Sequence, residues 1–137
     1  MAILGIFNKS NKTGNLVNNV QFKISTELFP YKLYSNRKCY STLTISITNI
    51  SDEPLLSSLN FELPSQLSFD ETGISHNKEI KLGELSQNEL KKINVNIYNN
   101  LKADAGNYTM IIIANSHYKD YDHVINSIRK KEIINVE

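Results

Sequence analysis

The sequence has no tryptophan and a single cysteine, Cys39, among its 137 residues. One thiol cannot form a disulfide within the chain, and a secreted domain of this size often has one. No apolar run reaches the ~18–20 residues that a membrane-spanning helix needs. A helical hydrophobic period is nearly absent as well, which disfavours a helical fold. These absences together favour a cytoplasmic protein built from strands.

An excess of charge of one sign is also missing. The chain has 15 basic and 14 acidic residues, which gives a formal net charge of +1. Proteins that bind nucleic acid through overall charge carry a marked basic excess, so we expect no nucleic-acid partner. Hydrophobic residues make up 40% of the chain and charged residues 21%, the proportions of an ordinary globular protein of one domain.

The sequence does contain repeated alternation of apolar and polar residues with a period of two. The clearest stretch is LTISIT at 43–48, in which Leu43, Ile45 and Ile47 share one face. Such alternation is typical of half-buried strands. Further strands are expected at 20–25, 31–34, 59–63, 79–82, 93–98, 107–114 and 124–136, with turns at 49–54 and at Gly83 and at most one helical turn at 86–92. We therefore predict an all-β fold, a two-sheet sandwich of seven to eight antiparallel strands.

The first residues do not follow this pattern. We predict a short flexible N-terminal arm at 1–14 and one sandwich domain at 15–137. The arm contains an apolar stretch at 2–7, followed by Lys9 and Lys12. A signal peptide has its basic residues before the apolar stretch, so we expect none here. One alternative function is a peripheral membrane adaptor that uses this arm, although the stretch is very short for membrane contact.

From Tyr40 onward the order of motifs is informative. TNISDEPL at 48–55 precedes a strand that ends at Leu63-Pro64, and KLGEL at 81–85 precedes LKADAGNYTMIIIA at 101–114. This order resembles the immunoglobulin-like modules called CARDB and NEW3, which are widespread in archaeal and bacterial proteins. The resemblance covers roughly residues 38–137 and implies an immunoglobulin-like β-sandwich. Because tryptophan is missing, it also implies that Leu59 or Phe61 fills the core position on the third strand.

The segment Asp104-Ala105-Gly106-Asn107-Tyr108 has a physical explanation of its own. A tyrosine at the start of this strand can turn its hydroxyl back onto the backbone a few residues upstream, which forms the tyrosine corner of sandwich domains. Gly106 supplies the backbone freedom just before it. We assign Gly106 and Tyr108 a structural role.

The sequence offers little for catalysis. It has three histidines and contains no G-x-S-x-G, Walker or H-E-x-x-H motif. Cys39 is in phase with Leu43 and Ile45, so we expect its thiol to point into the core, where it would be inert. We predict no catalytic residue, no cofactor and no enzymatic activity.

The best candidate for partner recognition is the stretch SHYKDYDH between the last two predicted strands. Tyrosines beside charged residues are typical of recognition surfaces, and end loops of sandwiches commonly bind partners. The candidate residues are His117, Tyr118, Lys119, Asp120, Tyr121, Asp122 and His123. Four of them, His117, Asp120, Asp122 and His123, are also competent ligands for a divalent ion, although strand alternation would separate some of these side chains.

The strand before this loop is apolar on both faces, because Met110, Ile111, Ile112 and Ile113 follow one another. One face belongs to the core. The other, with Ile111 and Ile113, is either covered by packing within the chain or contacts another protein, most simply a second copy in a homodimer.

We therefore predict a non-enzymatic interaction or assembly module. Its contacts would come from residues 117–123 and from Ile111 and Ile113, and its partner would be a protein. The family resemblance suggests a second function, a ligand-binding module for carbohydrate or a divalent metal, because similar modules accompany surface proteins and glycosidases.

Overall fold

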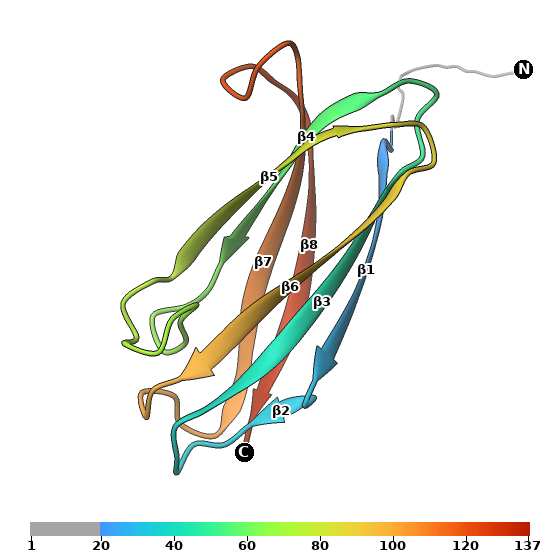
Figure 1. Cartoon of the computed structure of the whole chain (residues 1–137). Helices are drawn as coiled ribbons and strands as arrows, with labels where there is room; N and C mark the ends of the chain where they lie inside the picture. Colours follow the sequence, from blue (N-terminus) through green and yellow to red (C-terminus); the bar gives the residue numbers. More distant parts are fainter. Residues whose placement is uncertain (1–19) are drawn as a thin grey trace, which may run out of the picture.

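The computed structural model describes residues 20–137, and in this range the chain forms eight β-strands and no helix (Figure 1). The strands are β1 (Phe22–Phe29), β2 (Lys32–Leu33), β3 (Cys39–Asn49), β4 (Leu55–Glu62), β5 (Asn77–Leu85), β6 (Leu90–Asn99), β7 (Gly106–His117) and β8 (Val124–Val136). They form the predicted all-β sandwich. The predicted arm at 1–14 and the domain start at residue 15 lie outside the described residues.

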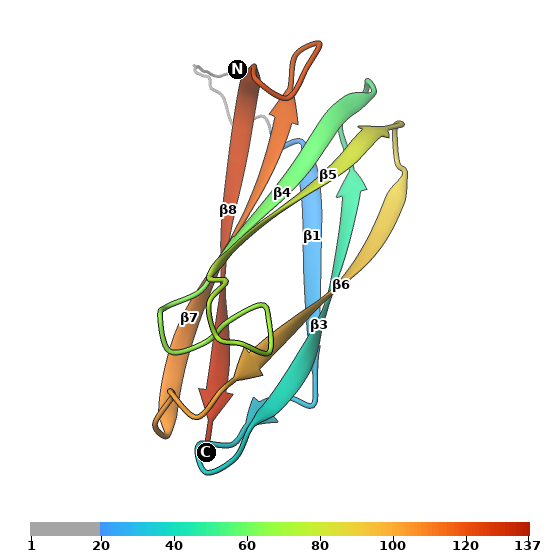
Figure 2. The same ribbon diagram turned by 60° about the vertical axis from the view of Figure 1, so that its left-hand side comes forward.

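The two sheets have three and five strands. The smaller has the order β1-β3-β6 and the larger the order β2-β8-β7-β4-β5. Figure 2 shows the two layers from the side. All paired strands are antiparallel except β2, which runs parallel to the end of β8. This short parallel pair is the one departure from the antiparallel arrangement that we predicted.

The period-two alternation of β3 decides which face enters the core. Leu43, Ile45 and Ile47 are fully buried, whereas Thr42 and Thr44 lie on the outer face. There the two threonine hydroxyls donate hydrogen bonds of 2.8 Å to Asn96 and Asn94 of β6. A solvated sheet face suits such β-branched polar residues.

The core between the sheets contains no tryptophan. Leu59 and Phe61 of β4 are both fully buried, and they face Ala114 and Ile112 in the register with β7. Phe69, from the loop between β4 and β5, packs edge-on against Phe61 with ring centroids 6.3 Å apart. We expected Leu59 or Phe61 to fill the core position left by the missing tryptophan, and both of them belong to the core.

Gly83 does not form the predicted turn. β5 continues through it. Ser57 of β4 pairs with Gly83 and Ser58 pairs with Lys81, so Leu82 is an extra residue that makes a β-bulge in β5. Gly83 has φ +76°, a conformation that glycine adopts without steric cost. The turn lies at residues 86–89 instead, where Ser86 and Glu89 exchange hydrogen bonds, and it contains no helical turn.

The connection into β7 has the geometry of a tyrosine corner. The Tyr108 hydroxyl donates a 2.7 Å hydrogen bond to the backbone carbonyl of Asp104. Gly106 has φ +155°, which lets the chain turn into the strand. Asn99 supports the same corner, because its side-chain oxygen accepts from the amides of Lys102 and Ala103.

Candidate functional site

The predicted recognition loop is a hairpin that joins β7 to β8 at one end of the sandwich, near the turn at residues 50–54 (Figure 1). Asp120 organises it, because its carboxylate accepts from the Asp122 amide at 3.0 Å and from the His123 ring at 2.7 Å. The hydrogen bond from His123 lowers the pKa of Asp120 below its ordinary value. The hairpin therefore has a fixed turn even though these side chains are exposed.

His117 is not on the surface of this hairpin. It is only 6% exposed, and its Nε2 lies 2.7 Å from the Ser58 hydroxyl of β4. Tyr121 packs edge-on over the His117 ring, with centroids 5.0 Å apart, and its hydroxyl accepts from the Gly83 amide of β5 at 2.9 Å. These two residues fold the hairpin onto the outer face of the five-stranded sheet. His117 is buried there and Tyr121 is half-buried.

A polar network continues from this anchor across three strands. The Asn115 amide donates to Asn60 at 3.0 Å and to Ser58 at 3.3 Å, and the Ser127 hydroxyl donates to Asn115 at 2.6 Å. It connects β4, β7 and β8 where the apolar part of β7 ends. The strand alternation alone did not predict this network. The signal was the polar triplet that follows Ala114, together with the two serines of β4.

The contact between Ser58 and His117 places a hydroxyl next to an imidazole, as a catalytic nucleophile and its base would be. Ser58 is fully buried, and Nδ1 of His117 is buried without a hydrogen-bond partner. A working pair needs access for a substrate and a third group that orients the imidazole. Here the contact is a buried hydrogen bond that ties β7 to β4.

The exposed half of the hairpin carries apolar side chains. Tyr118 is 59% exposed and Ile125 is 52% exposed. Ile125 has no partner in the register between β7 and β8, because His117 pairs with Val124 and Ser116 pairs with Asn126. A groove of about 260 Å³ lies beside them; it is lined by Glu53, Pro54, Leu55, Leu56, Glu84, His117, Tyr118, Lys119 and Ile125. We call the exposed residues Tyr118, Lys119, Asp120, Asp122, His123, Val124 and Ile125 the hairpin rim.

Ile111 and Ile113 lie apart from the hairpin rim. Both are half-buried on the outer face of the five-stranded sheet, where Asn115 separates them from His117. In the register, Ile111 lies between Glu62 and Lys131, and Ile113 between Asn60 and Arg129. They form a narrow apolar stripe among polar neighbours. The structure does not join this stripe to the hairpin in one surface.

The four potential metal ligands of the hairpin do not converge. His117 faces the buried Ser58, whereas Asp120 and His123 pair with each other on the exposed turn. Among residues 20–137, no three His, Cys, Asp or Glu side chains are placed to hold a metal ion. The described part of the chain also contains no helix of the length and apolarity needed to cross a membrane.

A second hollow lies at the opposite end of the sandwich. Tyr40 and Tyr98 are register partners on the outer face of the small sheet, and their rings are 5.4 Å apart and tilted by 35°. They line a pocket of about 330 Å³ with Lys38, Cys39, Glu71, Asn99 and Asn100, which we call the tyrosine pocket. The Cys39 thiol is half-buried and packs against the core. The residues of this pocket come from three separate segments, so no local sequence pattern predicts it.

Comparison with known proteins identifies the architecture. No protein-family model and no curated protein matches the chain. Among solved structures, part of native alpha-2-macroglobulin from Escherichia coli, spanning domain MG7 to the C-terminus, aligns with a TM-score of 0.61 and 16% identity. The alignment covers 88% of this chain but only 17% of that protein. The fold is that of an immunoglobulin-like β-sandwich.

A second similar structure is a FixG-related protein from Vibrio parahaemolyticus. It aligns with a TM-score of 0.53 and 9% identity, over 85% of this chain and 97% of that one. Identities this low establish the shared immunoglobulin-like fold and nothing about activity. The resemblance to CARDB and NEW3 modules, which no family model matches, stays a prediction.

Proposed function

We propose that this immunoglobulin-like domain is a non-enzymatic interaction module that binds a protein partner through the hairpin rim. One observation carries the proposal. The hairpin packs the buried His117 and the half-buried Tyr121 against β4 and β5, and it presents Tyr118 and Ile125 to solvent. A loop that is already ordered loses little entropy on binding, and tyrosine brings contact area with few rotatable bonds.

The groove beside the rim supports a protein partner in particular. Its lining combines the apolar residues Leu56 and Ile125 with the charged residues Glu53, Glu84 and Lys119. Protein interfaces commonly combine an apolar or aromatic centre with a charged edge that excludes water and sets orientation. A partner with an apolar anchor side chain would fit this arrangement.

The test compares partner capture by two matched double variants. Tyr118→Ala with Ile125→Ser removes the apolar rim. Tyr31→Ala with Ile133→Ser is the control, because these residues are 70% and 54% exposed, Tyr31 precedes β2 and Ile133 pairs with Thr109 near the start of β7, away from the hairpin. After cross-linking in the cells that produce the protein, mass spectrometry should find a partner with the wild type and the control but not with the rim variant. The same partners with all three proteins would contradict the proposal.

The tyrosine pocket favours carbohydrate binding as a second candidate function. Two tyrosine rings beside Lys38, Glu71 and Asn100 offer flat apolar faces next to hydrogen-bonding groups, which suits the two kinds of surface on a sugar ring. Titration with cellotetraose to millimolar concentration should shift the NMR amide signals of Tyr40 and Asn100 and leave those of the hairpin rim unchanged. No shift at the pocket would remove this candidate.

A further inference from the structure

The last strand, β8, is paired unequally on its two sides. One side pairs with β7 along the whole of Val124–Val136. The other side, within residues 20–137, pairs only at Asn135 and Val136, which lie beside Lys32 and Leu33 of β2. Most of a long strand therefore presents an unpaired row of backbone groups, and such a row is a template for another strand. We call residues 126–132 the β8 edge.

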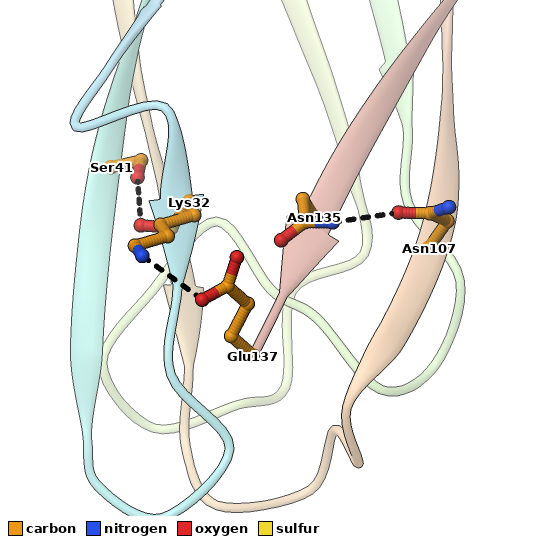
Figure 3. Close-up of polar contacts among 5 residues, drawn as sticks. All are labelled: Lys32, Ser41, Asn107, Asn135 and Glu137. Carbon is orange, nitrogen blue, oxygen red and sulfur yellow. Dashed lines mark hydrogen bonds and ion pairs between the residues drawn. The ribbon is translucent and has the colours of Figure 1, made fainter.

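The C-terminal end of β8, which follows this edge, is already paired with β2. Figure 3 shows the Lys32 ammonium 2.9 Å from the Glu137 carboxylate and the Asn135 side chain donating to Asn107 at 3.0 Å. The Glu137 amide also donates to the Leu33 carbonyl at 2.9 Å. β2 thus ends the open part of the strand at Asn135, and it leaves the β8 edge accessible.

Two other sheet edges are obstructed. β5 has the bulge at Gly83, whose amide donates to the Tyr121 hydroxyl, and the Lys91 ammonium donates to the Leu82 carbonyl at 3.2 Å. On β6, the amide and carbonyl of Tyr98 are both bonded to Ser68. Bulges and side-chain caps of this kind prevent strand addition. The remaining terminal strands are β1, which pairs with β3 on one side, and the two-residue β2.

The β8 edge has a strong local charge. Arg129, Lys130 and Lys131 are consecutive, and none forms an ion pair with any of residues 20–137. Alternation places Arg129 and Lys131 on the outer face, in register with Ile113 and Ile111. The one acidic residue of the edge, Glu132, accepts a hydrogen bond from Thr26 of β1. An added strand would meet two or three uncompensated positive charges.

The positive charge of the β8 edge indicates which kind of segment can pair with it. Antiparallel pairing with β8 of a second copy, centred on the basic run, would place like charges opposite each other, which is unfavourable. Residues 1–19 of this chain contain two lysines and no acidic residue, so they do not complement the edge either. We infer that the β8 edge binds an extended acidic segment of a partner protein, which adds a strand beside β8 with its carboxylates facing Arg129 and Lys131. This surface is separate from the hairpin rim.

Two synthetic peptides of about nine residues, a common strand length, test the inference. One alternates threonine with glutamate and the other alternates threonine with lysine. The glutamate peptide should shift the NMR amide signals of residues 126–132 and slow hydrogen exchange at those amides that β7 does not bind. The lysine peptide should do neither. Equal effects of the two peptides, or no effect of either, would overturn the inference.

Charge variants locate the site. Arg129→Glu with Lys131→Glu should weaken binding of the glutamate peptide about tenfold, and the milder Arg129→Gln with Lys131→Gln should weaken it less. Arg37→Glu with Lys38→Glu, in the loop after β2, is the matched control and should leave binding unchanged. The rim variant Tyr118→Ala with Ile125→Ser should also bind the peptide normally, so the failure of one proposal is distinguishable from that of the other.

Two results with the free protein would also overturn the inference. Slow exchange of every amide in residues 126–132 before any peptide is added would mean that the edge is already occupied. A dimer in light scattering that Arg129→Glu with Lys131→Glu dissociates would mean that a second copy is the occupant. We expect alternate amides of the edge to exchange quickly in the full chain.

Discussion

The imidazole of His117 and the hydroxyl of Ser58 lie 2.7 Å apart although 59 positions separate them in the sequence. This contact joins the hairpin at the end of β7 to the neighbouring strand β4. It explains why the hairpin has one buried half and one exposed half, since the ring of His117 also supports Tyr121. The exposed half is positioned by the buried one.

The first prediction concerns this anchor. His117→Ala should lower the free energy of unfolding by about 2–4 kcal/mol, because it removes a buried hydrogen bond and leaves a cavity under Tyr121. Ser58→Ala should cost less, about 1–2 kcal/mol, since it removes only the hydroxyl. Urea unfolding measures both. A loss below about 0.5 kcal/mol for His117→Ala, as is usual for an exposed residue, would contradict the buried position.

The second prediction tests the tyrosine corner. Tyr108→Phe should lower the free energy of unfolding by about 1 kcal/mol, because the Asp104 carbonyl loses its donor. The control is Tyr98→Phe, whose hydroxyl has only a long 3.5 Å contact with Asn96. Thermal and urea unfolding should separate the two variants. Equal stability of both variants would mean that the corner hydrogen bond contributes nothing.

The third prediction concerns the bulge in β5. Gly83→Ala should destabilise the fold by about 1–2 kcal/mol, although a Cβ at this position would meet nothing within 4 Å. The cost arises from φ +76°, so Gly83→Asn should be tolerated better than Gly83→Ala, because asparagine enters this region more readily. If alanine and asparagine behave alike, the backbone conformation is not the cause.

The fourth prediction concerns pH. The pKa of Asp120 is lowered by the hydrogen bond from His123, so the contribution of this pair to hairpin order is present above the ordinary carboxyl range. It is lost as the pH falls through the lowered pKa. In an NMR titration of the carboxyl carbon, His123→Ala should raise the Asp120 midpoint towards its ordinary value, and the distant His76→Ala should not move it. An unchanged midpoint in His123→Ala would disprove the assigned cause.

The strands could be predicted from the sequence because apolar residues such as Leu43, Ile45 and Ile47 alternate with polar ones. This alternation indicates which face of a strand is buried. The tyrosine at the start of β7 was equally readable, because its partner Asp104 is only four residues away. Local patterns thus predicted the fold well.

The site depended on contacts that local patterns do not contain. The polarity of Asn115 and His117 suggested that the strand ends at Ala114, yet both are buried because β4 supplies their hydrogen-bond partners. For the same reason, His117 and Tyr121 could not be told apart from Tyr118 by composition. The sequence predicts a turn at Gly83, and the structure has a bulge there, because both require the same backbone freedom.

The most direct test of the hairpin as a binding surface is site-specific photo-cross-linking in the cells that produce the protein. A photoreactive phenylalanine derivative replaces Tyr118 in one sample and Tyr31 in the other, both exposed tyrosines. We predict a discrete cross-linked protein band from position 118 and none of that mass from position 31. Cross-linking of that protein from position 31 alone, or from neither position, would contradict the account.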